Sequence, residues 1–240
     1  MTVLLTRGDR EFRCEPGEEL HTDLGVLTVP DDPQSGDTVE THLGEPFTVR
    51  ALRGPDFFDH LDRTGAPMMP KDIGLVMGYT GACGEDRVLD AGTGTGVLSA
   101  YLGRAGADVV TFERDAEFAE QARENMALAG VSDRVDVRTG DLLAEIDELG
   151  KFDLLTLDTG DAPALVERAP EVLVHGGYVV TYSPFVENAR GSAEAAREVG
   201  LSDVETTETI EREMTFDDRG TRPSTAGVGH TGYLTFARNL

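Results

Sequence analysis

The 240-residue chain has no tryptophan, only two cysteines and only two lysines, and it lacks any long apolar run. Cys14 and Cys83 lie far apart with no Cys-x-x-Cys or Cys/His spacing, which excludes a disulfide scaffold and a zinc finger. No segment approaches the ~20 apolar residues of a membrane-spanning helix, and the first residues become charged too early for a signal peptide. We therefore expect a soluble, cytoplasmic protein with no membrane partner.

Positive charge is also scarce, because 21 Lys and Arg stand against 45 Asp and Glu, a formal net charge of −24. This balance argues against binding nucleic acid by bulk attraction in dilute buffer. Lys71 and Lys151 are the two lysines and all other cations are arginine, so the composition resembles that of proteins from extreme halophiles. At ~1 M salt the Debye length falls to ~3 Å, so the repulsion among the protein's own charges is largely screened. The same salt weakens attraction to phosphates, so the lack of a basic patch is weak evidence against an RNA partner.

The chain divides into two parts with different patterns. Residues 2–52 hold short β-prone runs separated by turn clusters, which predicts a small all-β module. Residues 53–67 are rich in Gly, Pro and Asp and predict a connection with one short helix. We assign residues 1–66 to an N-terminal β domain with its linker and residues 67–240 to a second domain.

In the second domain, strands and helices alternate, which predicts parallel βαβ units. The expected fold class is α/β, a Rossmann-like doubly wound sheet. The C-terminal segment breaks the rhythm with two extended runs, 204–214 and 232–239, which predict a hairpin. The expected helices cover 71–80, 96–106, 116–130, 164–173 and 186–199, and the expected strands cover 87–91, 108–113, 134–140, 152–158 and 178–183.

A glycine-rich loop follows the first strand of this domain, in Val88-Leu-Asp-Ala-Gly-Thr-Gly-Thr-Gly96. Alternating glycines let the backbone turn sharply and let a ligand lie against bare main chain at a helix N-terminus. A dinucleotide fingerprint would need glycine where Val97 stands, although a nicotinamide cofactor stays an alternative. The pattern Asp-x-Gly-x-Gly-x-Gly instead resembles motif I of the class I S-adenosylmethionine-dependent methyltransferases, whose sheet has seven strands.

Acidic residues end the next strands of the predicted sheet. Glu113 lies 21 residues after Gly92, where a carboxylate can accept hydrogen bonds from both ribose hydroxyls. The resemblance implies that Asp141 contacts the adenine amino group, that Leu142 offers a backbone amide, and that Asp158 faces the substrate as the catalytic residue. The cofactor-binding residues it implies are Asp90, Gly92, Thr93, Gly94, Thr95, Gly96, Val97, Leu98, Glu113, Arg114, Phe118, Asp141, Leu142 and Asp158.

Three further features are similar to the archaeal tRNA (adenine-N1)-methyltransferases that act at positions 57 and 58. They are the N-terminal β module, the segment Met69-Pro-Lys-Asp72 and the ending Gly229-His-Thr-Gly-Tyr-Leu234, so the resemblance spans essentially the whole chain. It implies methyl transfer from S-adenosylmethionine to N1 of adenine in tRNA, with Asp158 near the adenine, and a homotetramer.

The chain also departs from that family around the substrate. After the acid the family continues with a Pro-x-Pro-Trp-like run, whereas this chain reads Asp158-Thr-Gly-Asp-Ala-Pro163, and Met69 stands where relatives carry an aromatic. We expect substrate contacts from Met69, Asp72, Tyr182 and Arg222. No metal site is expected, because the five histidines lie in separate segments without ligand spacing.

Two other functions stay open. A protein-L-isoaspartate O-methyltransferase shares the glycine loop but lacks this β module, and a non-catalytic tRNA-binding subunit would have no reason to keep all cofactor positions. For an RNA partner, we expect an arginine-bearing face on the N-terminal module that contacts phosphates, formed by Arg7, Arg10, Arg13, Arg50 and Arg53.

Overall fold

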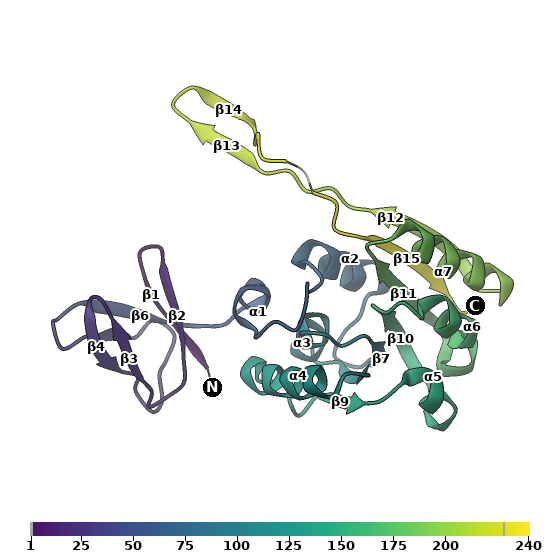
Figure 1. Cartoon of the computed structure of the whole chain (residues 1–240), viewed down its shortest axis with the longest axis horizontal. Coiled ribbons are helices and arrows are strands. Elements are labelled where there is room, and N and C mark those ends of the chain that lie inside the picture. Colours follow the sequence, from purple (N-terminus) through teal and green to yellow (C-terminus); the bar gives the residue numbers. More distant parts are fainter. Residues whose placement is uncertain (1, 228) are drawn as a thin grey trace.

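The computed structural model describes residues 2–227 and 229–240, and its N-terminal module consists of two small antiparallel sheets (Figure 1). Four strands pair in the order β2-β1-β6-β5, and β3 pairs with β4. Alternate side chains of these strands, such as Leu5, Phe47 and Val49, form a separate small core. The predicted all-β module is confirmed, with strands β1 (Val3–Arg7), β2 (Arg10–Cys14), β3 (Glu19–Thr22), β4 (Gly25–Thr28), β5 (Thr38–Glu40) and β6 (Pro46–Ala51).

The larger unit is built on a seven-stranded sheet of order β12-β15-β11-β10-β7-β8-β9. Neighbouring strands from β9 to β11 are parallel, and β15 is antiparallel to both β11 and β12. This confirms the predicted fold class, a Rossmann-like doubly wound sheet. The strands are β7 (Arg87–Ala91), β8 (Asp108–Glu113), β9 (Val135–Thr139), β10 (Phe152–Leu157), β11 (Leu173–Ser183), β12 (Ser202–Glu208) and β15 (Tyr233–Arg238).

Helices cover both faces of the sheet, and the strands are apolar on both sides as a doubly covered sheet requires. Val88 and Leu154 pack toward α2, α3 and α4, whereas Leu89 and Leu155 pack toward α5, α6 and α7. The helices are α1 (Gly54–His60), α2 (Pro70–Thr80), α3 (Val97–Arg104), α4 (Ala116–Ala129), α5 (Leu142–Glu145), α6 (Ala162–Val172) and α7 (Val186–Glu198), and a 3₁₀ turn (Ile146–Glu148) follows α5.

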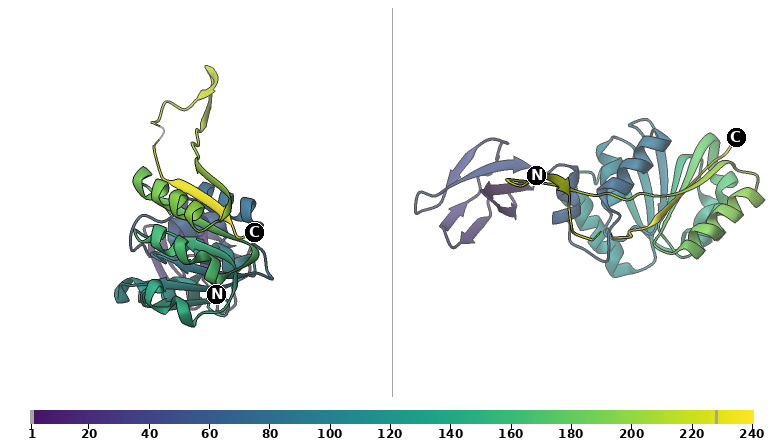
Figure 2. Two further views of the ribbon diagram at one scale, coloured as in Figure 1. Left: turned by 90° about the vertical axis from the view of Figure 1, so that its right-hand side faces the viewer. Right: turned by 90° about the horizontal axis from the view of Figure 1, so that it is seen from above.

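The C-terminal segment differs from its prediction. The expected pairing of two extended runs exists as β12 with β15, but the run 204–214 does not continue as one strand. The chain leaves the sheet after Glu208 and forms a second hairpin, β13 (Met214–Asp217) and β14 (Gly220–Pro223), before it returns. This hairpin, called the arm below, projects away from the sheet (Figures 1 and 2). Charged residues between β12 and β13 give that stretch no apolar face to pack on the core.

Candidate active site

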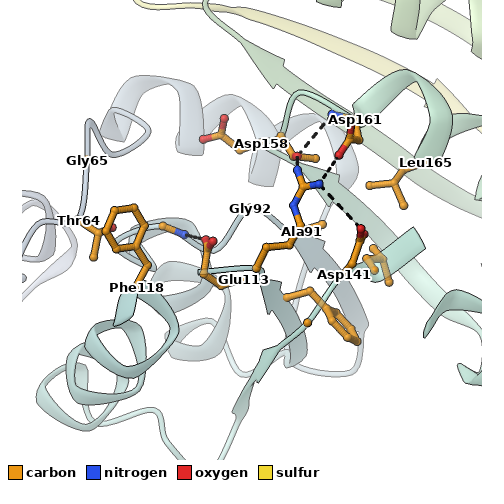
Figure 3. Close-up of a pocket in the computed structure, with 16 residues that line it drawn as sticks. Thr64, Gly65, Ala91, Gly92, Glu113, Phe118, Asp141, Asp158, Asp161 and Leu165 are labelled. Carbon is orange, nitrogen blue, oxygen red and sulfur yellow. Dashed lines mark hydrogen bonds and ion pairs between the residues drawn. The ribbon is translucent and has the colours of Figure 1, made fainter. Parts of the chain in front are cut away.

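The candidate site lies at the carboxyl edge of the sheet, where β7, β8, β9 and β10 end next to one another (Figure 3). β7 leads into loop 92–96, whose Gly92 amide donates to the carbonyl of Phe112 on β8 (3.0 Å). On the other side, the Asp158 amide donates to the Ala91 carbonyl (2.9 Å). These backbone bonds hold the glycine loop between the end of β8 and the loop after β10.

The three loop positions require glycine for different reasons. Gly92 and Gly94 both have left-handed backbones, with φ of +89° and +50°, which favour glycine. A Cβ on Gly92 would overlap the backbone carbonyl of Asp158, and one on Gly96 would overlap the Met126 side chain. At Gly94, by contrast, the nearest atom to a Cβ would be 3.9 Å away. Gly94 is therefore the position where bare backbone faces open space, while the other two serve the protein's own packing.

Asp90 lies buried beneath the loop and is 3% exposed. The hydroxyls of Thr111 (2.6 Å) and Ser99 (3.4 Å) donate to its Oδ2, and the Thr156 hydroxyl donates to its Oδ1 (2.5 Å). Burial raises the pKa of this carboxyl group, and the negative charge of Glu113 adds to the effect. Asp90 thus ties the ends of β8 and β10 and the start of α3 together under the loop.

Two adjoining hollows, of about 280 and about 60 Å³, open at this edge. They share part of the glycine loop and Asp158 as walls. All fourteen residues predicted to contact the cofactor line one hollow or the other. The larger is lined by Gly92, Gly94, Glu113, Arg114, Phe118, Asp141, Leu142 and Asp158, and the smaller also by Asp90, Thr93, Thr95, Gly96, Val97 and Leu98. Sequence reasoning missed Thr64 and Gly65, which line both.

Glu113 ends β8 with its carboxyl group in the larger hollow (Figure 3). Its Oε2 accepts from the Gly94 amide (3.0 Å) and its Oε1 from the Asp115 amide (3.1 Å). Each carboxylate oxygen can accept a second hydrogen bond, so both remain available to a ligand. The Asp115 carboxylate caps α4 by accepting from the amides of Glu117 and Phe118, which holds the Phe118 ring at the hollow's rim.

At the other end of the larger hollow, Arg114 connects two acidic loops. Its guanidinium group pairs with Asp161 (2.7 Å), donates to the Thr159 hydroxyl (3.4 Å) and lies 3.8 Å from Asp141. Asp141 caps α5 by accepting from the Leu143 amide (3.0 Å). Arg114 therefore links β8 to the loops after β9 and β10, and its partners Thr159 and Asp161 are site residues that sequence reasoning did not find.

Asp158 lies where the two hollows adjoin and is half-buried. Burial raises the pKa of its carboxyl group to about 7, and the negative charge of Asp90 contributes. Near neutral pH the group is therefore present in both protonation states. A carboxyl group with such a raised pKa beside an open hollow is typical of a functional site.

The Pro-Lys-Asp and His-Thr-Gly-Tyr segments meet in the fold. Lys71 Nζ donates to Asp72 Oδ1 (2.7 Å) and to the Thr231 hydroxyl (2.8 Å), and that hydroxyl donates to Asp72 Oδ2 (3.2 Å). The Tyr182 hydroxyl donates to the Thr231 carbonyl (2.9 Å). Burial, together with the charges of Asp72 and Asp158, raises the pKa of Tyr182 to about 12. The four residues form one cluster, called the Lys71 cluster below.

The residues predicted to contact the substrate are not gathered at one place. Tyr182 lies near enough to Asp158 to feel its charge. Asp72 is 1% exposed and hydrogen-bonded within the Lys71 cluster. Met69 lines a separate hollow of about 370 Å³. Arg222 is exposed on the arm, paired with a nearby acid and away from both hollows within this chain, because the arm carries it out of the sheet (Figure 1).

Four of the five arginines expected on an RNA-facing surface are paired with acids of the same chain. The exposed pairs among them contribute about 1 kcal/mol or less, so a phosphate could replace the acid, whereas Arg50 also pairs with Asp56, which is buried. Arg53 is exposed. The pairs join Arg7 to Glu45, Arg10 to Asp23, Arg13 to Asp62, and Arg50 to Glu11 and Asp56.

The described residues, 2–227 and 229–240, lack two kinds of feature. No helix in these ranges combines the length and apolar character needed to cross a membrane. Nor do three or more His, Cys, Asp or Glu side chains gather there in a way that could hold a metal ion.

The lining of the hollows fits an adenosine ligand with a cationic end. Glu113 and Asp141 are hydrogen-bond acceptors, which suit ribose hydroxyls and the adenine amino group. Arg114 is the one basic residue among those that line either hollow, so a pyrophosphate would find little neutralising charge. The sheet and this edge together define a Rossmann-like methyltransferase that depends on S-adenosylmethionine.

Comparison with known proteins identifies the family. The model of a family described as tRNA methyltransferase complex GCD14 subunit matches residues 60–221, and the chain belongs to this family. A relative from Methanocaldococcus jannaschii, tRNA (adenine(57)-N(1)/adenine(58)-N(1))-methyltransferase TrmI, is 32% identical over 262 residues, which cover 97% of this chain and 92% of the relative. The predicted enzyme class and cofactor are confirmed.

Solved structures agree with the fold. An S-adenosylmethionine-dependent O-methyltransferase from Thermotoga maritima superposes with a TM-score of 0.84 at 27% identity, covering 100% of this chain and 92% of that one. The tRNA (m1A58) methyltransferase TrmI from Aquifex aeolicus gives a TM-score of 0.78 at 24% identity, covering 100% and 97%. Both coverages include the N-terminal module as well as the sheet domain.

Proposed function

We propose that this enzyme transfers a methyl group from S-adenosylmethionine to N1 of adenine in tRNA, at position 57, position 58 or both. The observation that carries the proposal is the position of Asp158. Its backbone touches Gly92 of the glycine loop, and its carboxyl group lies where the two hollows adjoin. The relative that shares 97% of the chain's length is named for this reaction, which supports the same choice of target.

Cofactor binding is assigned to the fourteen residues that line the hollows. The Glu113 carboxylate, oriented by two backbone amides, accepts from the ribose hydroxyls. Asp141 and the Leu142 amide hold the edge of the adenine ring, and Phe118 covers it. Gly94 lets the ligand lie against main chain. When bound, S-adenosylmethionine supplies a methyl group on a positively charged sulfur, which suits a site with a single basic lining residue.

The chemistry asks for alignment and charge stabilisation rather than for a base. Adenine N1 carries an in-plane lone pair, so its bond to the methyl carbon can form while the carbon–sulfur bond breaks and that electron pair stays on sulfur. The ring then becomes cationic. As a carboxylate, Asp158 accepts a hydrogen bond from the adenine N6 amino group, which fixes the ring and stabilises its positive charge. The Lys71 cluster holds the Tyr182 hydroxyl, and Tyr182 lies near enough to Asp158 for the charge of that residue to contribute to the raised pKa of the tyrosine.

We assign tRNA binding to the N-terminal module, residues 1–66 with its linker, and methyl transfer to residues 67–240. Phosphates would displace acids from the arginine pairs of the module, which cost little to break. Deleting residues 1–52 should then abolish tRNA affinity, and equal affinity in the truncated protein would contradict this assignment.

We also infer a cytoplasmic homotetramer adapted to high salt. The arm supports self-association, because Met214 and Phe216 on it are 48% and 77% exposed, and exposed apolar side chains on a projecting hairpin are typical of an interface between copies. The net charge of −24 supports a saline setting, where self-repulsion is screened. We assign Met69 and Arg222 as substrate contacts in such an assembly. There, a neighbouring copy can complete the site that binds the target adenine.

An assay with unmodified tRNA transcript and methyl-labelled S-adenosylmethionine in molar KCl tests the proposal. Digestion to nucleosides should give label in 1-methyladenosine. Label on an isoaspartyl peptide but not on tRNA would favour the protein-L-isoaspartate O-methyltransferase alternative. Absence of any transfer and of any binding heat with the cofactor would favour a non-catalytic tRNA-binding subunit.

A further inference from the structure

A short segment without helix or strand crosses the candidate site. Residues 62–67, called the strap below, run between two buried anchors, Leu61 and Met68. Thr64 and Gly65 of the strap line both hollows opposite the glycine loop. The strap is thus one wall of the cofactor site, although it belongs to no helix or strand.

One buried side chain of α4 holds this strap in place. Asn125 is 0% exposed. Its Oδ1 accepts from the Asp62 amide (3.0 Å), while its Nδ2 donates to the Asp62 carbonyl (2.9 Å) and to the Thr95 carbonyl in the glycine loop (2.9 Å). The Thr64 amide also donates to the Thr95 hydroxyl (3.2 Å). Asn125 therefore joins the strap and the glycine loop through a single amide group.

The position is costly for a polar residue unless these bonds form. The neighbouring buried side chains on the same helix are Ala122, Met126 and Ala129, which pack in the apolar core. A buried polar group without partners is destabilising, so an amide here is stable only while the strap is closed on the loop. An amide also suits the site because it accepts one hydrogen bond and donates two at the same place, which a carboxylate cannot do.

We propose that Asn125 is a positioning residue for cofactor binding, which keeps the strap closed against the glycine loop. Asn125 does not line either hollow and does not touch the reacting atoms. Its loss removes three of the hydrogen bonds that hold residues 62–65 and leaves the Thr64–Thr95 bond and the Arg13–Asp62 pair, so the wall of the site is less ordered before the ligand binds. The affinity for S-adenosylmethionine then falls while turnover at saturating cofactor is kept. This inference rests on the proposed cofactor site.

The test compares wild type with Asn125→Ala and Asn125→Asp, the second of which keeps the side-chain volume and removes both donors. Each variant should raise the dissociation constant of S-adenosylmethionine about 10- to 100-fold, the range that the two or three lost hydrogen bonds represent. The maximal rate of methyl transfer should stay within about threefold. Val131→Ala, at a buried position of the same core away from the strap, is the matched control and should leave the dissociation constant unchanged.

Limited trypsin digestion supplies a readout that general destabilisation would not produce. Arg63 lies in the strap, and Arg197 lies in α7 of the sheet domain, where cleavage requires the helix to unfold. In the Asn125 variants, cleavage after Arg63 should accelerate while cleavage after Arg197 keeps its wild-type rate. An unchanged dissociation constant, or equal acceleration at both arginines, would overturn the inference. If wild type itself fails to bind S-adenosylmethionine, the proposed function fails instead, so the two failures are distinguishable.

Discussion

Replacing Asp158 by asparagine keeps the size of the side chain and removes its charge, so it isolates what the carboxylate does. With a pKa of about 7, Asp158 is about one-tenth ionised at pH 6 and about nine-tenths ionised at pH 8. If the carboxylate is the active form, the wild-type kcat/KM for the cofactor should rise about tenfold per pH unit below 7 and level off above about 8. The Asp158→Asn variant should be slower by about 100-fold or more and show no such rise.

The positive charge of the cofactor predicts a difference between the pH profiles of kcat and kcat/KM. A cation beside a carboxylate favours the charged form, so the rise in kcat, which reports the complex, should lie at lower pH than the rise in kcat/KM, which reports the free enzyme. Methyl transfer to tRNA transcript between pH 5.5 and 8.5 measures both profiles. A wild-type profile that is flat over this range, or an Asp158→Asn variant with the same rise, would refute the role of the carboxylate.

The same substitution should stabilise the fold. Because the pKa of Asp158 is raised on folding, from an ordinary 3.8 to about 7, its favourable contribution is complete below 3.8 and is lost as the pH rises to 7. The advantage of Asp158→Asn in free energy of unfolding should therefore grow between about pH 4 and 7 and then level off. Its upper bound is roughly 4 kcal/mol, reduced by the water that reaches the half-buried group. Urea unfolding at several pH values measures it.

Three further substitutions test other contacts. Gly92→Ala would place a Cβ against the backbone of the loop after β10, so it should raise the dissociation constant of S-adenosylmethionine at least about 100-fold in a binding titration. The control is Gly74→Ala, because Gly74 is exposed on α2 with open space around it. This control should stabilise the fold by about 0.5–1 kcal/mol. Glu113→Gln should raise that dissociation constant about 10- to 100-fold with little change in kcat, and an unchanged affinity would argue against a ribose contact. Lys71→Ala leaves the buried Asp72 carboxylate without its cation and should cost about 3–5 kcal/mol in urea unfolding, most of which the double variant Lys71→Met, Asp72→Asn should recover.

The cofactor edge could be predicted because its glycine loop and its three acids end or follow strands of the sheet. In a parallel sheet the carboxyl ends of neighbouring strands meet, so the glycine loop, Glu113, Asp141 and Asp158 come together once the strand order is known. Periodicity and turn residues were enough to find those strands, and the acids follow them directly.

The contacts that the sequence did not reveal join residues far apart along the chain. Asn125 bonds to Asp62 across 63 positions, and Lys71 bonds to Thr231 across 160. A single asparagine inside an apolar helix face does not indicate which segment it will hold. Likewise, the sequence predicts Arg222 near the substrate, whereas the chain leaves the sheet after Glu208 and carries this residue onto the arm.

The most direct test of the central claim is a crystal structure with S-adenosylhomocysteine, the product that keeps every binding group except the methyl. We expect the ribose hydroxyls to lie within hydrogen-bond distance of the Glu113 carboxylate, the adenine edge at Asp141 and the Leu142 amide, and the sulfur turned toward Asp158. A ligand bound at another edge of the sheet, or a sulfur turned away from Asp158, would contradict this expectation.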